Sequence, residues 1–167
     1  MDAVTHVPAP INETVLDYAP GSPERAALEV ALVELSGTKH DLPHTIGGVR
    51  VEGKGPRLEV RQPHAHAKVL GVTRGATKTE AAAAVDAAVA AAPAWRDMAF
   101  DDRAAILLKA ADLLAGPWRA KINAATMLGQ SKTAFQAEID SACELIDFWR
   151  FNVLFADEIL REQPRSS

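Results

Sequence analysis

The stretch EIDSACELIDFWRFN, residues 138–152, carries the helical pattern that decides the fold of the C-terminal part of the chain. Apolar residues recur every three or four positions through it and on both sides, which is typical of a helix with one buried face. We therefore predict a long helix over about residues 132–162. Its apolar stripe consists of Phe135, Ile139, Ala142, Ile146, Trp149 and Val153.

The single cysteine of the chain, Cys143, lies in this stretch. A catalytic cysteine needs a lowered pKa, which a cationic neighbour, a helix N-terminus or a paired histidine provides. The charged residues around Cys143 are acidic and would raise its pKa; they are Glu138, Asp140, Glu144 and Asp147. Beside an apolar stripe a free cysteine behaves as a small hydrophobic residue. We interpret Cys143 as a packing residue.

Three of these carboxylates, Asp140, Glu144 and Asp147, share one face of the predicted helix, and we call them the acidic ridge. No Lys or Arg lies between Lys132 and Arg150 to compensate them. Like charges at this spacing destabilise an isolated helix by a few tenths of a kcal/mol per pair. A solvated face is the usual explanation of such a run. The ridge could also receive a cationic ligand group or an arginine from another segment.

Capping signals place two helices earlier in the chain. Ser22 is a suitable N-cap for a helix that ends before Gly37. Thr77 and Glu80 have the spacing of a capping box, and the helix that they open is expected to end near Pro93.

Two further helices are expected between residues 100 and 129. The first opens with an aspartate cap in FDDR, residues 100–103, and breaks at Gly116 and Pro117. The second runs to Gly129. The apolar stripe of the first contains Ile106, Leu107, Ala110, Leu113 and Leu114.

The stretch from His44 to Thr77 has the alternating pattern and the glycines of short strands joined by turns. We predict a small antiparallel meander, too small to be stable alone. The fold class is therefore α+β, mostly helical with a small β meander. We divide the chain into an extended N-terminal arm (1–20), a helix with the meander (21–75) and a helical segment (76–167).

Composition excludes several classes of function. A net charge of −4 without any basic cluster argues against nucleic-acid binding. One cysteine excludes an intrachain disulfide and fits a reducing compartment. No apolar run has the length of a membrane span. Residues 1–20 contain acidic residues and no arginine, unlike a secretory or mitochondrial leader, so a cytoplasmic location is expected.

The sequence offers no metal or nucleotide motif. His40 and His44, like His64 and His66, are close together but lack the further ligands of a zinc site. The glycines in GGVRVEGKG, residues 47–55, match neither a P-loop nor a dinucleotide fingerprint. We expect no metal site and no cofactor-binding residues in this chain.

Four segments together resemble the N-terminal part of the L-glutamate γ-semialdehyde dehydrogenases, also called 1-pyrroline-5-carboxylate dehydrogenases, a branch of the aldehyde dehydrogenase superfamily. They are GSPER (21–25), RAAILLKAADLLAGPWR (103–119), ATMLGQSKTAFQAEID (125–140) and ELIDFWRFN (144–152). The resemblance extends from about residue 13 to residue 164. It implies the N-terminal segment of the α/β aldehyde dehydrogenase fold, with residues 76–167 packed on an NAD-binding domain outside this chain.

The resemblance implies a reaction of proline catabolism. In this family a cysteine thiolate attacks the aldehyde, hydride passes to NAD, and a glutamate-activated water releases L-glutamate. The catalytic Cys and Glu are expected beyond residue 167, because Cys143 lacks the Gly-Gln-Lys-Cys-Ser context of the family's nucleophile. This chain alone is then inactive, with no catalytic residue. The full-length protein would use NAD and a small-molecule substrate and form a homo-oligomer.

One substrate-binding residue is implied by the resemblance. The family's glutamate in the ELIDF stretch lies near the amino end of the substrate, and it corresponds to Glu144. A carboxylate is a suitable partner for the ammonium group of an amino-acid aldehyde. The alternative is a non-catalytic helical interaction module that binds a partner through exposed apolar surface.

Overall fold

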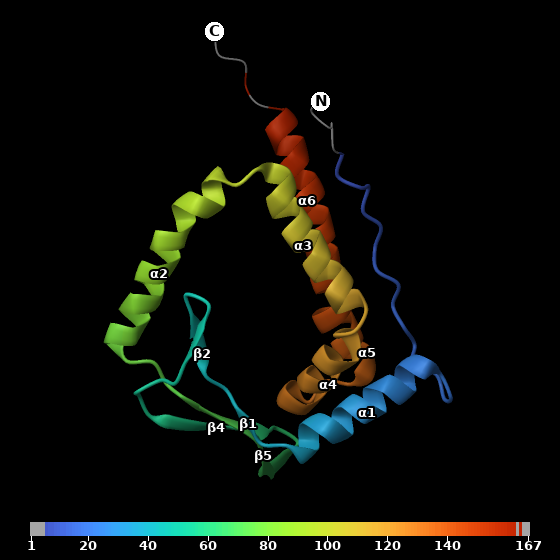
Figure 1. Ribbon diagram of the computed structural model, residues 1–167. Coiled ribbons are helices and arrows are strands. Elements are labelled where there is room, and N and C mark those ends of the chain that lie inside the picture. The colour runs from blue at the N-terminus through green and yellow to red at the C-terminus, as the bar shows by residue number, and fades with distance from the viewer. Residues whose placement is uncertain (1–5, 163, 165–167) are drawn as a thin grey trace.

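Helices form most of the structure, a computed structural model that describes residues 6–162 and 164 (Figure 1). The helices are α1 (Pro23–Gly37), α2 (Lys78–Asp97), α3 (Phe100–Ala115), α4 (Arg119–Gln130), α5 (Ala134–Ala137) and α6 (Glu144–Arg161), with a π-helical turn, η1 (Glu138–Cys143), between the last two. The strands are β1 (His40–Asp41), β2 (His44–Ile46), β3 (Val49–Val51), β4 (Arg57–Gln62) and β5 (Ala65–Arg74). The α+β class expected from the sequence is confirmed.

The core lies where α1 packs against α4 and where α3 packs against α6. Its first cluster is Tyr18, Leu28, Ala31 and Ala124, and its second is Ala111, Leu114, Ala142 and Ile146. The stripe predicted for the C-terminal helix is buried at Ala142, Ile146 and Val153. The prediction was wrong at Phe135, which is 60% exposed. The π turn adds a residue to the helix and so shifts every position before it around the axis.

Local capping was predicted correctly for α1 and α2. The Ser22 hydroxyl accepts a hydrogen bond from the Arg25 amide, and Thr77 with Glu80 forms a complete capping box. The predicted end at Pro93 was wrong, because α2 continues to Asp97. The alanines around Pro93 favour helix, and α2 buries none of its residues, so water can solvate the carbonyl that the proline leaves unbonded.

The N-cap of α3 differs from the prediction, but the helix ends where it was predicted to end. The N-cap is Ala99, which makes no side-chain capping bond, so the expected aspartate cap is wrong. Asp101 and Asp102 lie in the first turn instead, where negative charge is favourable near the helix N-terminus. The helix ends at the predicted break, with Gly116 as its C-cap.

The strands form a three-stranded sheet of order β1-β5-β4 and a separate β2-β3 hairpin. The β4-β5 and β2-β3 pairs are antiparallel as predicted, but β1 joins β5 in parallel. The long connection from residue 42 to residue 64 lets the chain return in that direction. Gly71 permits the close approach, because a Cβ there would lie 2.7 Å from the His40 carbonyl oxygen.

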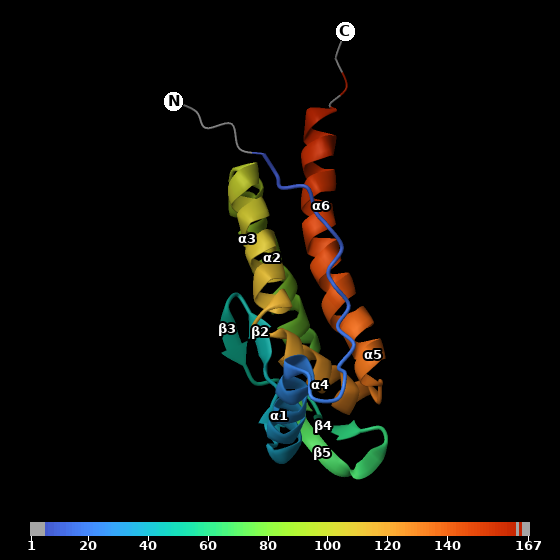
Figure 2. The same cartoon turned by 90° about the vertical axis from the view of Figure 1, so that its right-hand side faces the viewer.

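Residues 6–20 of the N-terminal arm run without regular secondary structure along α6 and then turn toward α1 (Figure 2). The sequence predicts an extended arm, but it does not indicate that the arm contributes to the core, and Tyr18 is buried in the first core cluster. Tyr18 also has a positive φ of 55°, which is strained for a bulky side chain and needs compensating contacts.

No helix in the described part of the chain is long and apolar enough to cross a membrane.

Candidate functional site

The acidic ridge divides into two satisfied carboxylates and one free carboxylate. Asp140 forms an ion pair with Lys132. Asp147 accepts hydrogen bonds from the Asn12 side-chain amide at 2.8 Å and from the Glu13 backbone amide at 2.7 Å. The side chain of Glu144 is exposed and makes no hydrogen bond or ion pair with any residue that the structure describes. Glu144 is therefore the member of the ridge that is available to a ligand.

The π turn η1 lies immediately before Glu144. The backbone N–H of Glu144 donates to the carbonyl oxygen of Ile139, five residues earlier, instead of to the fourth residue back as in an α-helix. Sequence spacing predicted one unbroken helix through this region. Single-turn π segments of this kind are frequent at functional sites.

The first residue of η1, Glu138, has a fully buried carboxylate, with an exposed fraction of 0%. It accepts hydrogen bonds from the Tyr18 hydroxyl at 2.7 Å, the Asn123 side-chain amide at 2.7 Å and the Leu16 backbone amide at 2.8 Å. The guanidinium of Arg119 completes the set with an ion pair. Four donors, two from the N-terminal arm and two from α4, therefore converge on one side chain.

Electrostatic interactions keep both Glu138 and Arg119 charged. Burial raises the pKa of the Glu138 carboxyl, but the hydrogen bonds from Arg119, the Leu16 amide, Tyr18 and Asn123 outweigh burial, so the net shift of the pKa is downward. Burial also lowers the pKa of Arg119, but the hydrogen bonds to Glu138 and Glu13 outweigh it and the net shift is upward. An ionised carboxylate and a guanidinium therefore face each other in the interior.

The arm is bound to the helices by further charged contacts. Glu13 accepts from Arg119 at 2.6 Å and from Arg150 at 2.7 Å, and so bridges α4 and α6. Arg119 also donates to the Thr14 carbonyl oxygen at 2.6 Å. We call Glu13, Arg119, Glu138 and Arg150 the arm clasp. It fixes the arm against the helical surface next to Glu144.

Cys143 lies beside the clasp, in surroundings that do not suit a nucleophile. Its thiol is buried, with Sγ 3.6 Å from a Glu138 oxygen. Burial and the nearby Glu138 charge raise the pKa of Cys143 to about 11, so the thiol stays protonated at neutral pH. These properties support the interpretation of Cys143 as a packing residue.

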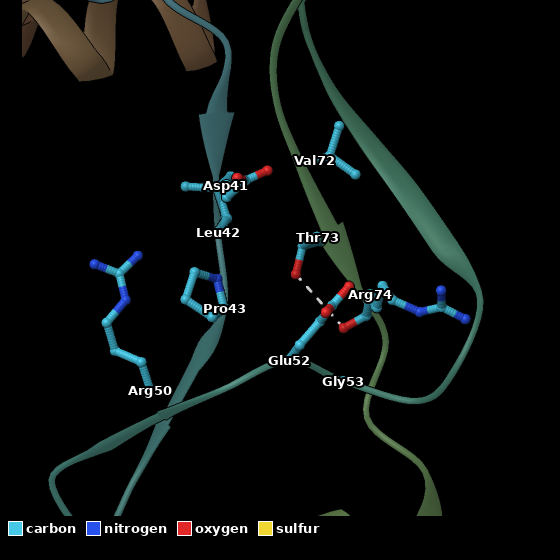
Figure 3. Close-up of a pocket in the computed structure, with 9 residues that line it drawn as sticks. All are labelled: Asp41, Leu42, Pro43, Arg50, Glu52, Gly53, Val72, Thr73 and Arg74. Atoms are coloured by element: carbon cyan, nitrogen blue, oxygen red, sulfur yellow. Dashed lines mark hydrogen bonds between the residues drawn. The ribbon is translucent and has the colours of Figure 1, made fainter.

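A separate pocket lies between the β2-β3 hairpin and β5 (Figure 3). It is lined by Asp41, Leu42, Pro43, Arg50, Glu52, Gly53, Val72, Thr73 and Arg74. The side chains carry charges of both signs, and no group of three or more His, Cys, Asp or Glu among residues 6–162 could hold a metal ion. This pocket supplies no obvious catalytic group.

Sequence reasoning missed Arg119 and Glu138. The two residues are separated by 19 positions, so no helical spacing connects them. Both lie inside the segments that carry the family resemblance, which is the one signal that could have drawn attention to them.

Comparison with known proteins gives a consistent result. The model of the aldehyde dehydrogenase family matches residues 50–166. A Δ1-pyrroline-5-carboxylate dehydrogenase of Agaricus bisporus is 44% identical over 97% of this chain and 30% of its own length. The mitochondrial Δ1-pyrroline-5-carboxylate dehydrogenase of Homo sapiens is 45% identical over 93% of this chain and 27% of its own length.

Solved structures of similar proteins also match this chain over nearly its whole length and about a third of their own. The Mycobacterium tuberculosis Δ-pyrroline-5-carboxylate dehydrogenase, solved with bound NAD, is 60% identical with a TM-score of 0.96 and matches 100% of this chain and 31% of that one. A mutant of the Thermus thermophilus 1-pyrroline-5-carboxylate dehydrogenase is 30% identical with a TM-score of 0.87, over 98% of this chain and 31% of that one. The chain thus spans about 30% of the length of the relatives that it matches.

Proposed function

Because this chain belongs to the aldehyde dehydrogenase family, we propose that it forms the N-terminal part of an NAD-dependent dehydrogenase of proline catabolism. The reaction would be oxidation of L-glutamate γ-semialdehyde, formed from 1-pyrroline-5-carboxylate, to L-glutamate. The observation that carries this proposal is the match of the whole chain, at a TM-score of 0.96 and 60% identity, to a Δ-pyrroline-5-carboxylate dehydrogenase.

The described residues do not fit an NAD site by themselves. Gly47 and Gly48 form the tight turn of the β2-β3 hairpin, and neither precedes a helix whose N-terminus could bind a pyrophosphate. Gly53 and Gly55 are packed against the backbone of Arg74 and Gly75. NAD would bind to the remaining part of such a protein, together with the catalytic Cys and Glu.

Glu144 is the residue of this chain that we assign to the substrate. Its exposed carboxylate has no partner among the described residues, while Asp140 and Asp147 on either side are already engaged. A carboxylate can accept charge-assisted hydrogen bonds from the ammonium group of the semialdehyde, and such bonds are about twice as strong as neutral ones. Glu144 would orient the amino-acid end of the substrate and leave the aldehyde for the catalytic groups.

The alternative, a non-catalytic interaction module, draws on exposed apolar residues of α6. Phe148, Phe155 and Ile159 are 60%, 48% and 67% exposed. A chain that spans about 30% of its relatives is expected to expose the surfaces that the rest of the fold covers, so these residues do not favour the alternative. Homo-oligomer formation stays a prediction, as does a cytoplasmic location, since several relatives are named as mitochondrial.

A chimeric enzyme tests the proposal. Residues 1–167 would replace the matching third of the M. tuberculosis enzyme, and NADH formation would be followed with 1-pyrroline-5-carboxylate. We expect turnover by the chimera and none by the isolated chain above a heat-killed control. A chimera that folds and binds NAD but does not oxidise the semialdehyde would refute the proposed substrate. Turnover by the isolated chain would show that the catalytic groups lie within it.

A further inference from the structure

The direction in which Glu144 points depends on the π turn before it. An α-helix turns by about 100° per residue, and a π turn contains one extra residue. Relative to Glu138, Glu144 is therefore rotated by about 100° from the position that it would have in an unbroken α-helix. The extra residue decides which face of the helix presents the Glu144 carboxylate.

Contacts inside η1 show how the π turn is held. Glu138 and Cys143 are five residues apart, which in a regular α-helix would place them about 140° apart around the axis. Here their side chains meet at 3.6 Å on the same side. Both also contact the arm, Glu138 through the Leu16 amide and Cys143 through the Thr14 carbonyl oxygen at 3.8 Å.

Apart from the Cys143 thiol at 3.6 Å, the donors to Glu138 come from outside the turn. Tyr18 and Leu16 belong to the arm, while Arg119 and Asn123 belong to α4. A regular α-helix could keep Glu138 in this position only by rotating everything that follows it. The burial of a charged carboxylate with these partners therefore favours the π geometry over the α geometry.

We propose that Glu138 is a positioning residue: by binding the arm and α4 it fixes the π turn, and the π turn sets the orientation of Glu144 toward the substrate. The inference rests on the proposed function, because it requires that Glu144 binds the ammonium group of an amino-acid aldehyde. Glu138, whose partners lie 15 to 122 positions away in the sequence, would then make the specificity for an amino-acid aldehyde possible. Simple aldehydes without an ammonium group do not depend on it.

The test compares two acid-to-amide variants of the same turn in the chimera. Glu138→Gln removes the buried charge, and Asp140→Asn is the matched control, because Asp140 is exposed and contacts Lys132 instead of the clasp. The readout is the ratio of kcat/KM for the semialdehyde to kcat/KM for a simple aliphatic aldehyde at fixed NAD. We expect Glu138→Gln to lower this ratio by about 10-fold, as for a weakened charged hydrogen bond, and Asp140→Asn to leave it unchanged.

A double-mutant cycle separates this inference from the proposed function. If Glu138 acts through Glu144, Glu138→Gln should lower the ratio no further in a Glu144→Gln background. If Glu144→Gln alone leaves the ratio unchanged, the assigned role of Glu144 is wrong, and the inference fails with it. If Glu144→Gln lowers the ratio but Glu138→Gln reduces activity on both aldehydes equally, only the positioning role is wrong.

A milder variant keeps the test informative if Glu138→Gln does not fold. Tyr18→Phe removes the hydrogen bond from the Tyr18 hydroxyl to Glu138 and keeps the ring in the core. It should lower the same ratio in the same direction by a smaller factor. An unchanged ratio in a folded Tyr18→Phe chimera would overturn the inference.

Discussion

Replacement of Arg119 by methionine should destabilise the chain more than any change of a surface charge. The Arg119 side chain is 9% exposed and that of Glu138 is 0% exposed, so the variant would leave a carboxylate in the interior without its cation. It would also remove the hydrogen bonds to Glu13 and to the Thr14 carbonyl oxygen, which fix the arm. Removing one partner of a buried ion pair costs about 3–5 kcal/mol.

Urea unfolding of the 167-residue chain, followed by far-ultraviolet circular dichroism, measures this loss. The control is Arg25→Met, because Arg25 forms an exposed pair with Glu29 and is 47% exposed. Exposed pairs of this kind contribute about 0.2–1 kcal/mol. A double variant, Arg119→Met with Glu138→Met, should recover much of the stability, since well-packed apolar groups can replace a buried pair. Equal losses for Arg119→Met and Arg25→Met would refute the argument.

Three further predictions concern single residues. Folding lowers the pKa of Glu138 from its ordinary value of 4.5, so its carboxylate stabilises the fold fully above that pH and the contribution is lost as the pH falls through the folded value. Between about pH 5 and pH 3 the parent chain should therefore lose more stability than Glu138→Gln, and equal losses would contradict the shift. Cys143→Ala should lower the free energy of unfolding by roughly 1 kcal/mol. The Cys143 thiol, with a pKa of about 11, should resist alkylation at neutral pH until the chain unfolds, and rapid labelling of the folded chain would contradict its burial. In the chimera, Glu144→Gln should lower kcat/KM for the semialdehyde by about 10- to 150-fold, the loss of one charged hydrogen bond, and an equal loss on a simple aliphatic aldehyde would show that Glu144 only supports the helix.

The sequence predicted the features that depend on neighbouring residues. The cap at Ser22 and the capping box at Thr77 were correct, because each involves a contact three residues away along the chain. The buried positions Ala142 and Ile146 were also correct, since Ala142 lies near the end of the π turn, Ile146 lies in α6, and the two are four residues apart. Family resemblance, carried by a few segments, identified the fold of which this chain is a part.

The features that were missed depend on residues far apart in sequence. The acidic ridge lacks cations between Lys132 and Arg150, yet Lys132 itself pairs with Asp140, and the arm supplies the donors for Asp147. The π turn could not be read from spacing either. Its cause is the burial of Glu138, whose partners lie up to 122 residues away.

The arm clasp also determines when, during synthesis, the arm can reach its final position. Glu13 is made before its partners, and Arg150 follows it 137 residues later. Arg119 follows Glu13 by 106 residues and Glu138 follows Tyr18 by 120 residues, so until these are made the arm has no guanidinium to bind and Tyr18 has no carboxylate to hold its left-handed backbone. Contacts of such long range form late, because the entropy of closing the loop must be overcome before they stabilise anything. Glu13 and Tyr18 of the arm are thus translated before their partners and are among the last residues to reach their final place.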